Sequence, residues 1–121
     1  MLPSMKFTVV IDENSMNWHN DAHLMKAFVE QTIKYLCLLY EHSSLGILFV
    51  SEVFNALGEE TTLLAHAFGY NRFDENAKLP AGADTFDIQC GISKTGKPIV
   101  TVSFEAYFLF NSTQETFGLL K

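Results

Sequence analysis

The strongest constraint on the fold is a stretch from residue 17 to residue 42 that contains neither glycine nor proline. Its apolar residues recur at steps of three, four or seven, which places them on one face of an α-helix. They are Trp18, Ala22, Met25, Val29, Leu36 and Tyr40, and the face is widened by Leu24, Phe28, Tyr35 and Leu39. Ser15 or Asn17 is expected to cap the first turn. The pattern predicts one long helix over residues 17–42, roughly 37 Å in length.

The two halves of this predicted helix differ in polarity. Polar side chains follow one side of the first half: His19, His23, Lys26, Glu30 and Lys34. In residues 35–40, YLCLLY, Cys37 and Leu38 stand where that polar side would continue. A helix that is apolar nearly all round is buried by neighbouring layers or by another chain. We therefore expect the last turns to be sandwiched within the fold or covered by a second copy of the protein.

The remaining segments predict a small sheet. Residues 5–12 alternate polar and apolar side chains, as a half-buried strand does, and residues 51–68 have the pattern of short helices ended by Gly58 and Gly69. Residues 71–83 form a loop, and residues 85–110 indicate a β-hairpin followed by an aromatic strand. We expect a single domain over residues 1–121 of the α+β class, with one long helix packed on a small antiparallel sheet, plus short helices.

One motif in the predicted hairpin resembles a nucleotide site. Residues 91–98, GISKTGKP, stop one residue short of the phosphate-binding pattern GxxxxGK[ST], because Pro98 occupies the hydroxyl position. A phosphate loop also needs a helix after it, whereas residues 99–104 are β-branched and aromatic. The motif therefore predicts a hairpin turn, with Gly96 at a positive φ angle and Pro98 as the first residue of the next strand. No cofactor is expected.

Charge and composition exclude several classes of partner. The formal net charge is −6, and the eight Lys and Arg residues are scattered along the chain, which argues against nucleic-acid binding. The N-terminal residues lack the pattern of a signal peptide, and the apolar runs are too short to cross a bilayer. Cys37 and Cys90 lie far apart in sequence and are expected to be reduced thiols. These features predict a cytoplasmic protein without a membrane partner.

The sequence offers little support for catalysis. His19 and His23 are four residues apart, so on a helix both imidazoles could share a metal ion, but no third ligand follows at a suitable spacing. We therefore interpret them chiefly as a solvated helix start, and a metal-dependent enzyme is the second alternative to the main hypothesis. Neither cysteine has an activating base nearby in sequence, and no serine lies in a GxSxG elbow. No catalytic residue is predicted.

Two groups of residues are candidates for binding. Apolar side chains at the end of the long helix and along the aromatic strand exceed what one face of a small sheet buries, and predict contact with a protein partner or a homodimer. They are Tyr35, Leu38, Tyr40, Phe104, Tyr107, Phe108 and Phe110. The alternative is a small-molecule site at which the loop over residues 71–83 closes against His66, Tyr70 and Arg72.

Part of the chain resembles a known family. Residues 45–71, LGILFVSEVFNALGEETTLLAHAFGYN, and residues 86–108, FDIQCGISKTGKPIVTVSFEAYF, are similar to the C-terminal domain of a family of uncharacterised proteins from phages and prophages of Gram-positive bacteria. The family usually has a Trp where this chain has Tyr70, and a membrane-spanning N-terminal part that these residues do not show. The resemblance implies origin in a phage or another mobile element. It leads us to expect an accessory protein that binds a host or defence protein, or itself.

Overall fold

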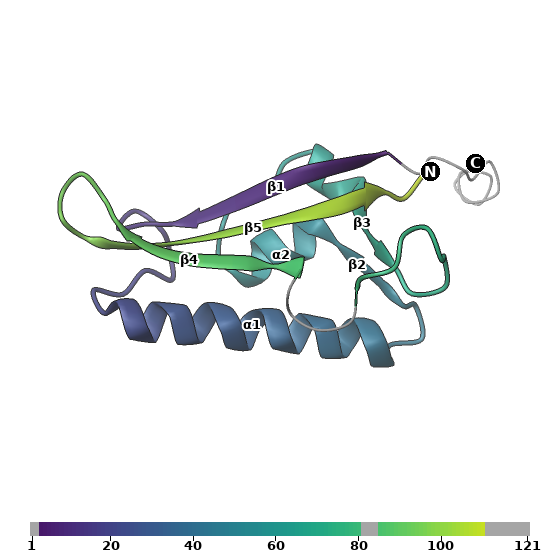
Figure 1. Ribbon diagram of the computed structural model, residues 1–121, viewed down its shortest axis with the longest axis horizontal. Coiled ribbons are helices and arrows are strands. Elements are labelled where there is room, and N and C mark those ends of the chain that lie inside the picture. The colour runs from purple at the N-terminus through teal and green to yellow at the C-terminus, as the bar shows by residue number, and fades with distance from the viewer. Residues whose placement is uncertain (1–2, 81–84, 111–121) are drawn as a thin grey trace.

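The computed structural model describes residues 3–80 and 85–110 and confirms the predicted α+β class. In chain order the elements are β1 (Ser4–Ile11), α1 (Ala22–His42), β2 (Ile47–Phe49), α2 (Val50–Ala56), the 3-10 turn η1 (Leu64–His66), β3 (Phe68–Asn71), β4 (Asp87–Ile92) and β5 (Pro98–Phe108). All five strands join one antiparallel sheet, and α1 runs beneath it (Figure 1). No helix in these ranges is both long enough and apolar enough to cross a bilayer.

β5 is the central strand of the sheet. One of its edges pairs with β1 from Val100 to Tyr107. Its other edge has two partners, because β4 pairs with residues 98–103 and β3 pairs with Tyr107 and Phe108. β2 extends the sheet beyond β3. β4 therefore ends the sheet on its side, and no other strand of the described chain pairs with its second edge.

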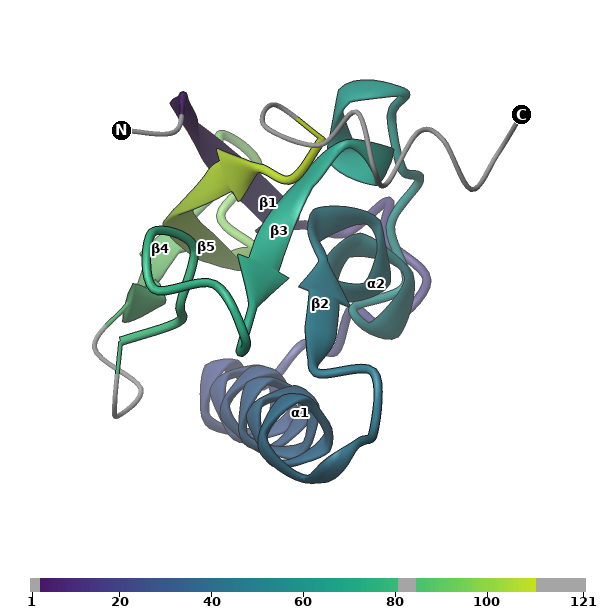
Figure 2. The same cartoon turned by 90° about the vertical axis from the view of Figure 1, so that its right-hand side faces the viewer.

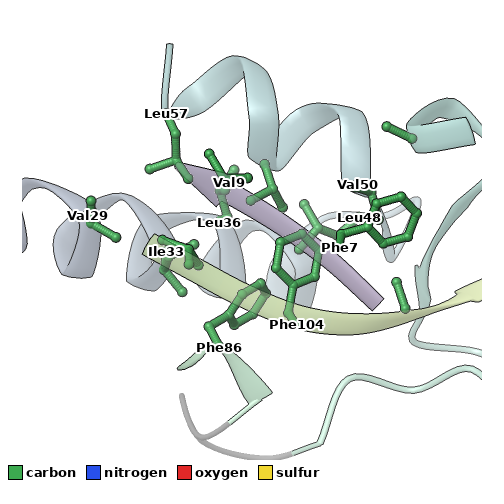
Figure 3. Packing of buried hydrophobic residues seen from close by; sticks show 14 of the residues in the cluster. Phe7, Val9, Val29, Ile33, Leu36, Leu48, Val50, Leu57, Phe86 and Phe104 are labelled. Atoms are coloured by element: carbon green, nitrogen blue, oxygen red, sulfur yellow. The ribbon is translucent and has the colours of Figure 1, made fainter. Parts of the chain in front are cut away.

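The core lies between this sheet and the helices. Every second residue of β5, from Val100 to Ala106, is buried together with Phe7, Val9 and Ile11 of β1. α1 contributes five buried residues on one face: Met25, Val29, Ile33, Leu36 and Tyr40. Figure 3 shows Phe86, just before β4, packed beside the central aromatic ring of Phe104, with ring centroids 5.0 Å apart. The alternation predicted from the sequence is thus the alternation that fills the core.

α1 begins at Ala22 and not at the predicted residue 17. Asp21 caps the helix, because its carboxylate accepts hydrogen bonds from two backbone N–H groups of the first turn, at 2.9 and 3.3 Å. Ser15 and Asn17, the predicted caps, lie in the connection between β1 and α1. An aspartate satisfies the free N–H groups of a helix start as well as a serine or an asparagine does. The absence of glycine and proline therefore did not fix the boundary.

The connection between β1 and α1 is tied to the rest of the fold by side chains. The Ser15 hydroxyl donates to the Glu59 carboxylate at 2.8 Å. The Trp18 indole N–H donates to the Pro98 carbonyl oxygen at 2.8 Å, at the first residue of β5. These two contacts hold the connection in place without a helix.

The middle of the chain contains less helix than predicted. Of residues 51–68, the structure forms a helix only to Ala56, with a 3-10 turn at Leu64–His66. Phe68–Asn71 forms β3, which the sequence had assigned to a helix end and a loop. A Cβ atom at Gly69 would lie 2.9 Å from the Cα atom of Phe49 on β2, so this close pairing requires glycine. A four-residue strand with a central glycine shows too little alternation to be recognised.

The predicted loop over residues 71–83 starts within β3 and continues as turns. The Asn71 N–H donates to the Ala77 carbonyl oxygen at 2.8 Å, and Ala77 is buried. Residues 81–83 of the predicted loop lie outside the described residues.

The GISKTGKP motif is a hairpin turn, as predicted. Ser93 N–H donates to the Lys97 carbonyl oxygen at 2.7 Å, and Gly96 has a φ angle of 81°. Pro98 is the first residue of β5, so a strand and not a helix follows the loop. That strand continues without a break to Phe108, which joins the second hairpin strand and the predicted aromatic strand into one element.

Candidate functional site

The aromatic strand predicted as an interface is part of the core. Phe104 is only 2% exposed, and Tyr107 and Phe108 are half-buried near the end of β5. Phe110 stacks on Phe49 of β2, with ring centroids 6.3 Å apart. Because β5 is central and its aromatic side chains pack on neighbouring strands, it does not present the apolar surface that we expected. This corrects the expectation for Phe104 in particular.

The end of the long helix divides between core and surface. Tyr40 is 5% exposed, and its hydroxyl oxygen accepts a hydrogen bond from the Leu79 N–H at 3.1 Å, so it is a core residue and not an interface residue. Tyr35 and Leu38 are 60% and 47% exposed. The described part of the chain does not sandwich these last turns, so their outer sides stay available to a partner.

The three residues predicted to bind a small molecule lie in different surroundings. His66 is exposed on η1, whereas Tyr70 is buried in β3. Arg72 donates through Nη2 to the Ser43 carbonyl oxygen at 2.5 Å, and its guanidinium lies over the Phe73 ring. Ser43 is the C-cap of α1, where the partial negative charge of the helix end favours a cation. Arg72 therefore anchors the end of α1.

Tyr70 has a structural role at the junction of three strands. Its hydroxyl donates to the carbonyl oxygen of Glu105, which lies between the part of β5 that pairs with β4 and the part that pairs with β3. Without a strand opposite it, this carbonyl would lack a partner on that edge. Burial is the main cause that raises the pKa of Tyr70 above its usual value, so the hydroxyl keeps its proton further into the alkaline range than an exposed tyrosine does.

His19 and His23 do not share a helical face, because His19 precedes the Asp21 cap. Among residues 3–80 and 85–110, no three His, Cys, Asp or Glu side chains are grouped so that they could hold a metal ion.

A groove with a volume of about 690 Å³ lies between α1 and β4. Its floor is apolar and its rim on α1 is charged. The residues that line it are Lys26, Glu30, Gln31, Ile33, Lys34, Cys37, Leu38 and Glu41 of α1, with Leu79, Pro80, Phe86 and Ile88 from the opposite wall. Figure 1 shows β4 as the strand nearest to α1 along this side. None of the residues predicted to bind a small molecule lines the groove.

The groove contains one thiol and several charged side chains of α1. Cys37 is half-buried in it, and burial, with a smaller contribution from the carboxylate of Glu41, raises the pKa of its thiol. A raised pKa disfavours the thiolate, which is the nucleophilic form. Lys26, Glu30 and Lys34 alternate in charge along the rim, and none of them forms a salt bridge with another described residue.

The β4 edge beside the groove carries unpaired backbone groups. Ser93 and Lys97 lie opposite each other at the turn and form a backbone hydrogen bond. In an antiparallel ladder, hydrogen-bonded pairs alternate with non-hydrogen-bonded pairs, so this bond sets the pattern for β4 and β5. The pair of Ile92 with Pro98 is then non-hydrogen-bonded, as proline requires. It follows that the N–H and C=O groups of Ile88, Cys90 and Ile92 point away from β5, and no described residue pairs with them.

Sequence reasoning missed this site because its two walls are distant in the chain. The charged side of α1 was visible as a polar helical face, and β4 was visible as an alternating strand. β4 and β3 both pair with the same edge of β5, and β2 continues the sheet from β3 and not from β4. β3 was not recognised in the sequence, so the position of β4 at the sheet edge could not be predicted.

Comparison of the chain with protein families, with curated proteins and with solved structures finds no match in any of the three. The phage origin implied by the resemblance therefore stays a prediction.

Proposed function

We propose that this protein is a protein-binding module that takes an extended segment of a partner into the groove between α1 and β4. The observation that carries the proposal is the edge of β4 beside that groove, with which none of residues 3–80 and 85–110 pairs. Ile88, Cys90 and Ile92 each offer one donor and one acceptor there, and a strand added to a sheet edge satisfies both. Main-chain hydrogen bonds then supply affinity, and side-chain pockets supply specificity.

The groove defines the kind of segment that fits. An added strand would lie about 4.8 Å from β4, and its successive side chains would alternate between the groove and the outer face of the sheet. The inward set meets the apolar floor formed by Ile33, Phe86 and Ile88, so alternate residues of the partner are expected to be apolar. The outward set lies beside Gln89, which is exposed, and can be polar.

The length of the segment follows from β4. Asp87–Ile92 is a six-residue strand, so a partner segment of comparable length pairs along the whole edge. The resemblance to phage proteins favours a protein of the infected cell as the source of that segment.

A pair of substitutions at Cys90 tests strand addition. Proline at Cys90 removes an N–H that points to the free edge, while the ladder with β5 does not use it. Cys90→Ala keeps that N–H and serves as the matched control. The Cys90 side chain is exposed, so both variants remove the same side chain without opening a cavity in the core. Linear peptides selected from a displayed random library on the unmodified protein are the probe. We expect Cys90→Ala to bind them unchanged and Cys90→Pro to bind them at least tenfold more weakly.

The fold of both variants is checked by thermal unfolding before binding is measured. Gln89→Pro serves as a second comparison for Cys90→Pro. The Gln89 N–H belongs to the ladder with β5, so its loss should destabilise the sheet, whereas Cys90→Pro should not. Failure to enrich any peptide would contradict the proposal, as would peptides that bind folded Cys90→Pro as tightly as Cys90→Ala.

A further inference from the structure

A second surface of α1 is apolar and uncovered by the described chain. Leu24, Phe28, Gln31, Tyr35 and Leu38 follow one another at steps of four, three, four and three residues. We call this row the α1 seam. Steps of four and three are the spacing of a coiled-coil contact line. The side chains of Leu24, Tyr35 and Leu38 are 54%, 60% and 47% exposed.

The α1 seam is centred away from the core face of the helix, and it meets the groove at Gln31 and Leu38. Leu24, Phe28 and Tyr35 each precede a core residue by one position, which turns them about 100° from the core face of the helix. The centre of the groove side, which carries Lys26 and Glu30, lies on the other flank of that face, and its lining extends to Gln31 and Leu38 at the border of the seam. Figure 2, which looks along α1, shows β4 on one side of the helix and β2 with α2 on the other, and the face below α1 open.

We propose that two copies of the chain associate through the α1 seam in antiparallel orientation, with the two-fold axis at Gln31. The order of side chains along the seam is nearly symmetric about Gln31, because Leu24 and Leu38 lie equally far from it on its two sides. An antiparallel two-fold arrangement therefore places leucine against leucine, and Phe28 against Tyr35 of the second copy. Each residue meets a side chain of the same kind.

The polar centre and the helix ends identify the occupant as a second copy. Gln31 would be buried at the axis, where an amide needs both a donor and an acceptor, and Gln31 of the second copy supplies both. A single polar residue in such a seam is a known means of fixing register. The antiparallel orientation opposes the two helix dipoles and brings the Asp21 carboxylate toward His42 of the second copy.

The size of the seam sets the strength of the dimer. The exposed parts of its apolar side chains, with Leu39 beside them, amount to about 400 Å² per copy, which is a patch of the size that marks interfaces. Two such patches fall at the small end of specific interfaces, so the dimer dissociates on dilution. The seam shares Gln31 and Leu38 with the groove, whereas Leu24, Phe28 and Tyr35 do not line it.

Sedimentation equilibrium across a wide concentration range tests the association. Tyr35→Glu places a charge in the seam, and because Tyr35 is exposed in the single chain, the substitution leaves the fold intact. We expect it to weaken dimerisation at least tenfold. Leu63→Glu is the matched control, because Leu63 is 87% exposed and lies far from α1 in the chain, and it leaves the dimer unchanged. A monomer at every concentration, or a dimer that tolerates Tyr35→Glu, overturns the proposal.

Disulfide cross-linking tests the orientation in a background in which Cys37→Ala and Cys90→Ala remove the native thiols. Gln31→Cys should form a cross-linked dimer with itself, because the axis brings the two copies of this position together. Leu24→Cys mixed with Leu38→Cys should cross-link each to the other and neither to itself. Cross-links of Leu24→Cys with itself would show a parallel pair, and a dimer without any Gln31→Cys cross-link would show another surface; either result overturns the α1 seam arrangement.

Discussion

Tyr70 donates its hydroxyl hydrogen to the Glu105 carbonyl oxygen at the point where β5 changes its partner from β4 to β3. Replacing it with phenylalanine keeps the ring, which packs 6.3 Å from the ring of Phe86, and removes only the donor. We expect Tyr70→Phe to lower the free energy of unfolding by about 1–3 kcal/mol, because a partly buried carbonyl is left unpaired.

Urea unfolding measures this loss, and Tyr35→Phe is the matched control. The Tyr35 side chain is exposed, so loss of its hydroxyl should change stability by less than about 0.5 kcal/mol. Equal effects of the two substitutions would show that the bond to Glu105 contributes nothing.

The same residue predicts how stability depends on alkaline pH. Burial raises the pKa of Tyr70 in the folded protein, whereas in the unfolded chain it is about 10. Above that value the unfolded chain loses a proton that the folded protein retains, so the contribution is complete below about pH 10 and is lost as the pH rises further. Urea unfolding from neutral to alkaline pH should show a steeper loss for the unmodified protein than for Tyr70→Phe. Parallel curves for the two proteins would contradict this assignment.

At the scale of elements, two glycines with different surroundings provide another comparison. Gly69 lies against β2, where a Cβ atom would meet backbone of Leu48 and Phe49, neither of which can move without disturbing the strand pair. Gly96 has no atom near its Cβ position, so only its positive φ angle opposes a side chain. We expect Gly96→Ala to cost about 1 kcal/mol and Gly69→Ala about 3 kcal/mol or more. Thermal unfolding of both variants shows which substitution costs more stability. A larger loss for Gly96→Ala than for Gly69→Ala would show that the pairing of β2 with β3 contributes little to the stability of the fold.

The elements that the sequence predicted well are those with long, regular patterns. The periodicity that ends at His42 gave the long helix, and the alternation around Gly96 and Pro98 gave the hairpin. The start of α1 was misplaced because Asp21 caps as well as the two earlier candidates, and β3 was missed because it is short and contains Gly69.

The candidate site could be predicted only in its parts. The polar side of α1 was evident from residues such as Lys26 and Glu30, but its opposition to β4 follows from how β5 divides its edge between β4 and β3. The aromatic side chains of β5 were assigned to a surface because composition does not reveal that a strand is central. Burial of Phe104 depends on Phe7 and Phe86, which come from distant parts of the chain.

At the scale of the whole molecule, α1 carries two proposed contacts. The groove is centred on one flank and the α1 seam on the other, and Gln31 and Leu38 belong to both. Because Tyr35 does not line the groove, we expect Tyr35→Glu, which opposes dimerisation, to leave peptide affinity within about twofold of the unmodified protein. Fluorescence anisotropy with a labelled selected peptide measures this at concentrations below and above dimerisation. A large change would show that the second copy alters the groove, and would contradict this prediction.

The central position of β5 also has a consequence for how the protein is made. β5 follows every other strand in the chain, yet β1, β3 and β4 all pair with it directly. While the ribosome has not yet released residues 98–108, the growing chain holds α1 and β1 without the strand that joins them. We infer that the nascent protein exposes the apolar face of α1 until residues 98–108 have left the ribosome, and depends during that interval on chaperones or on rapid closure of the hairpin of β4 and β5.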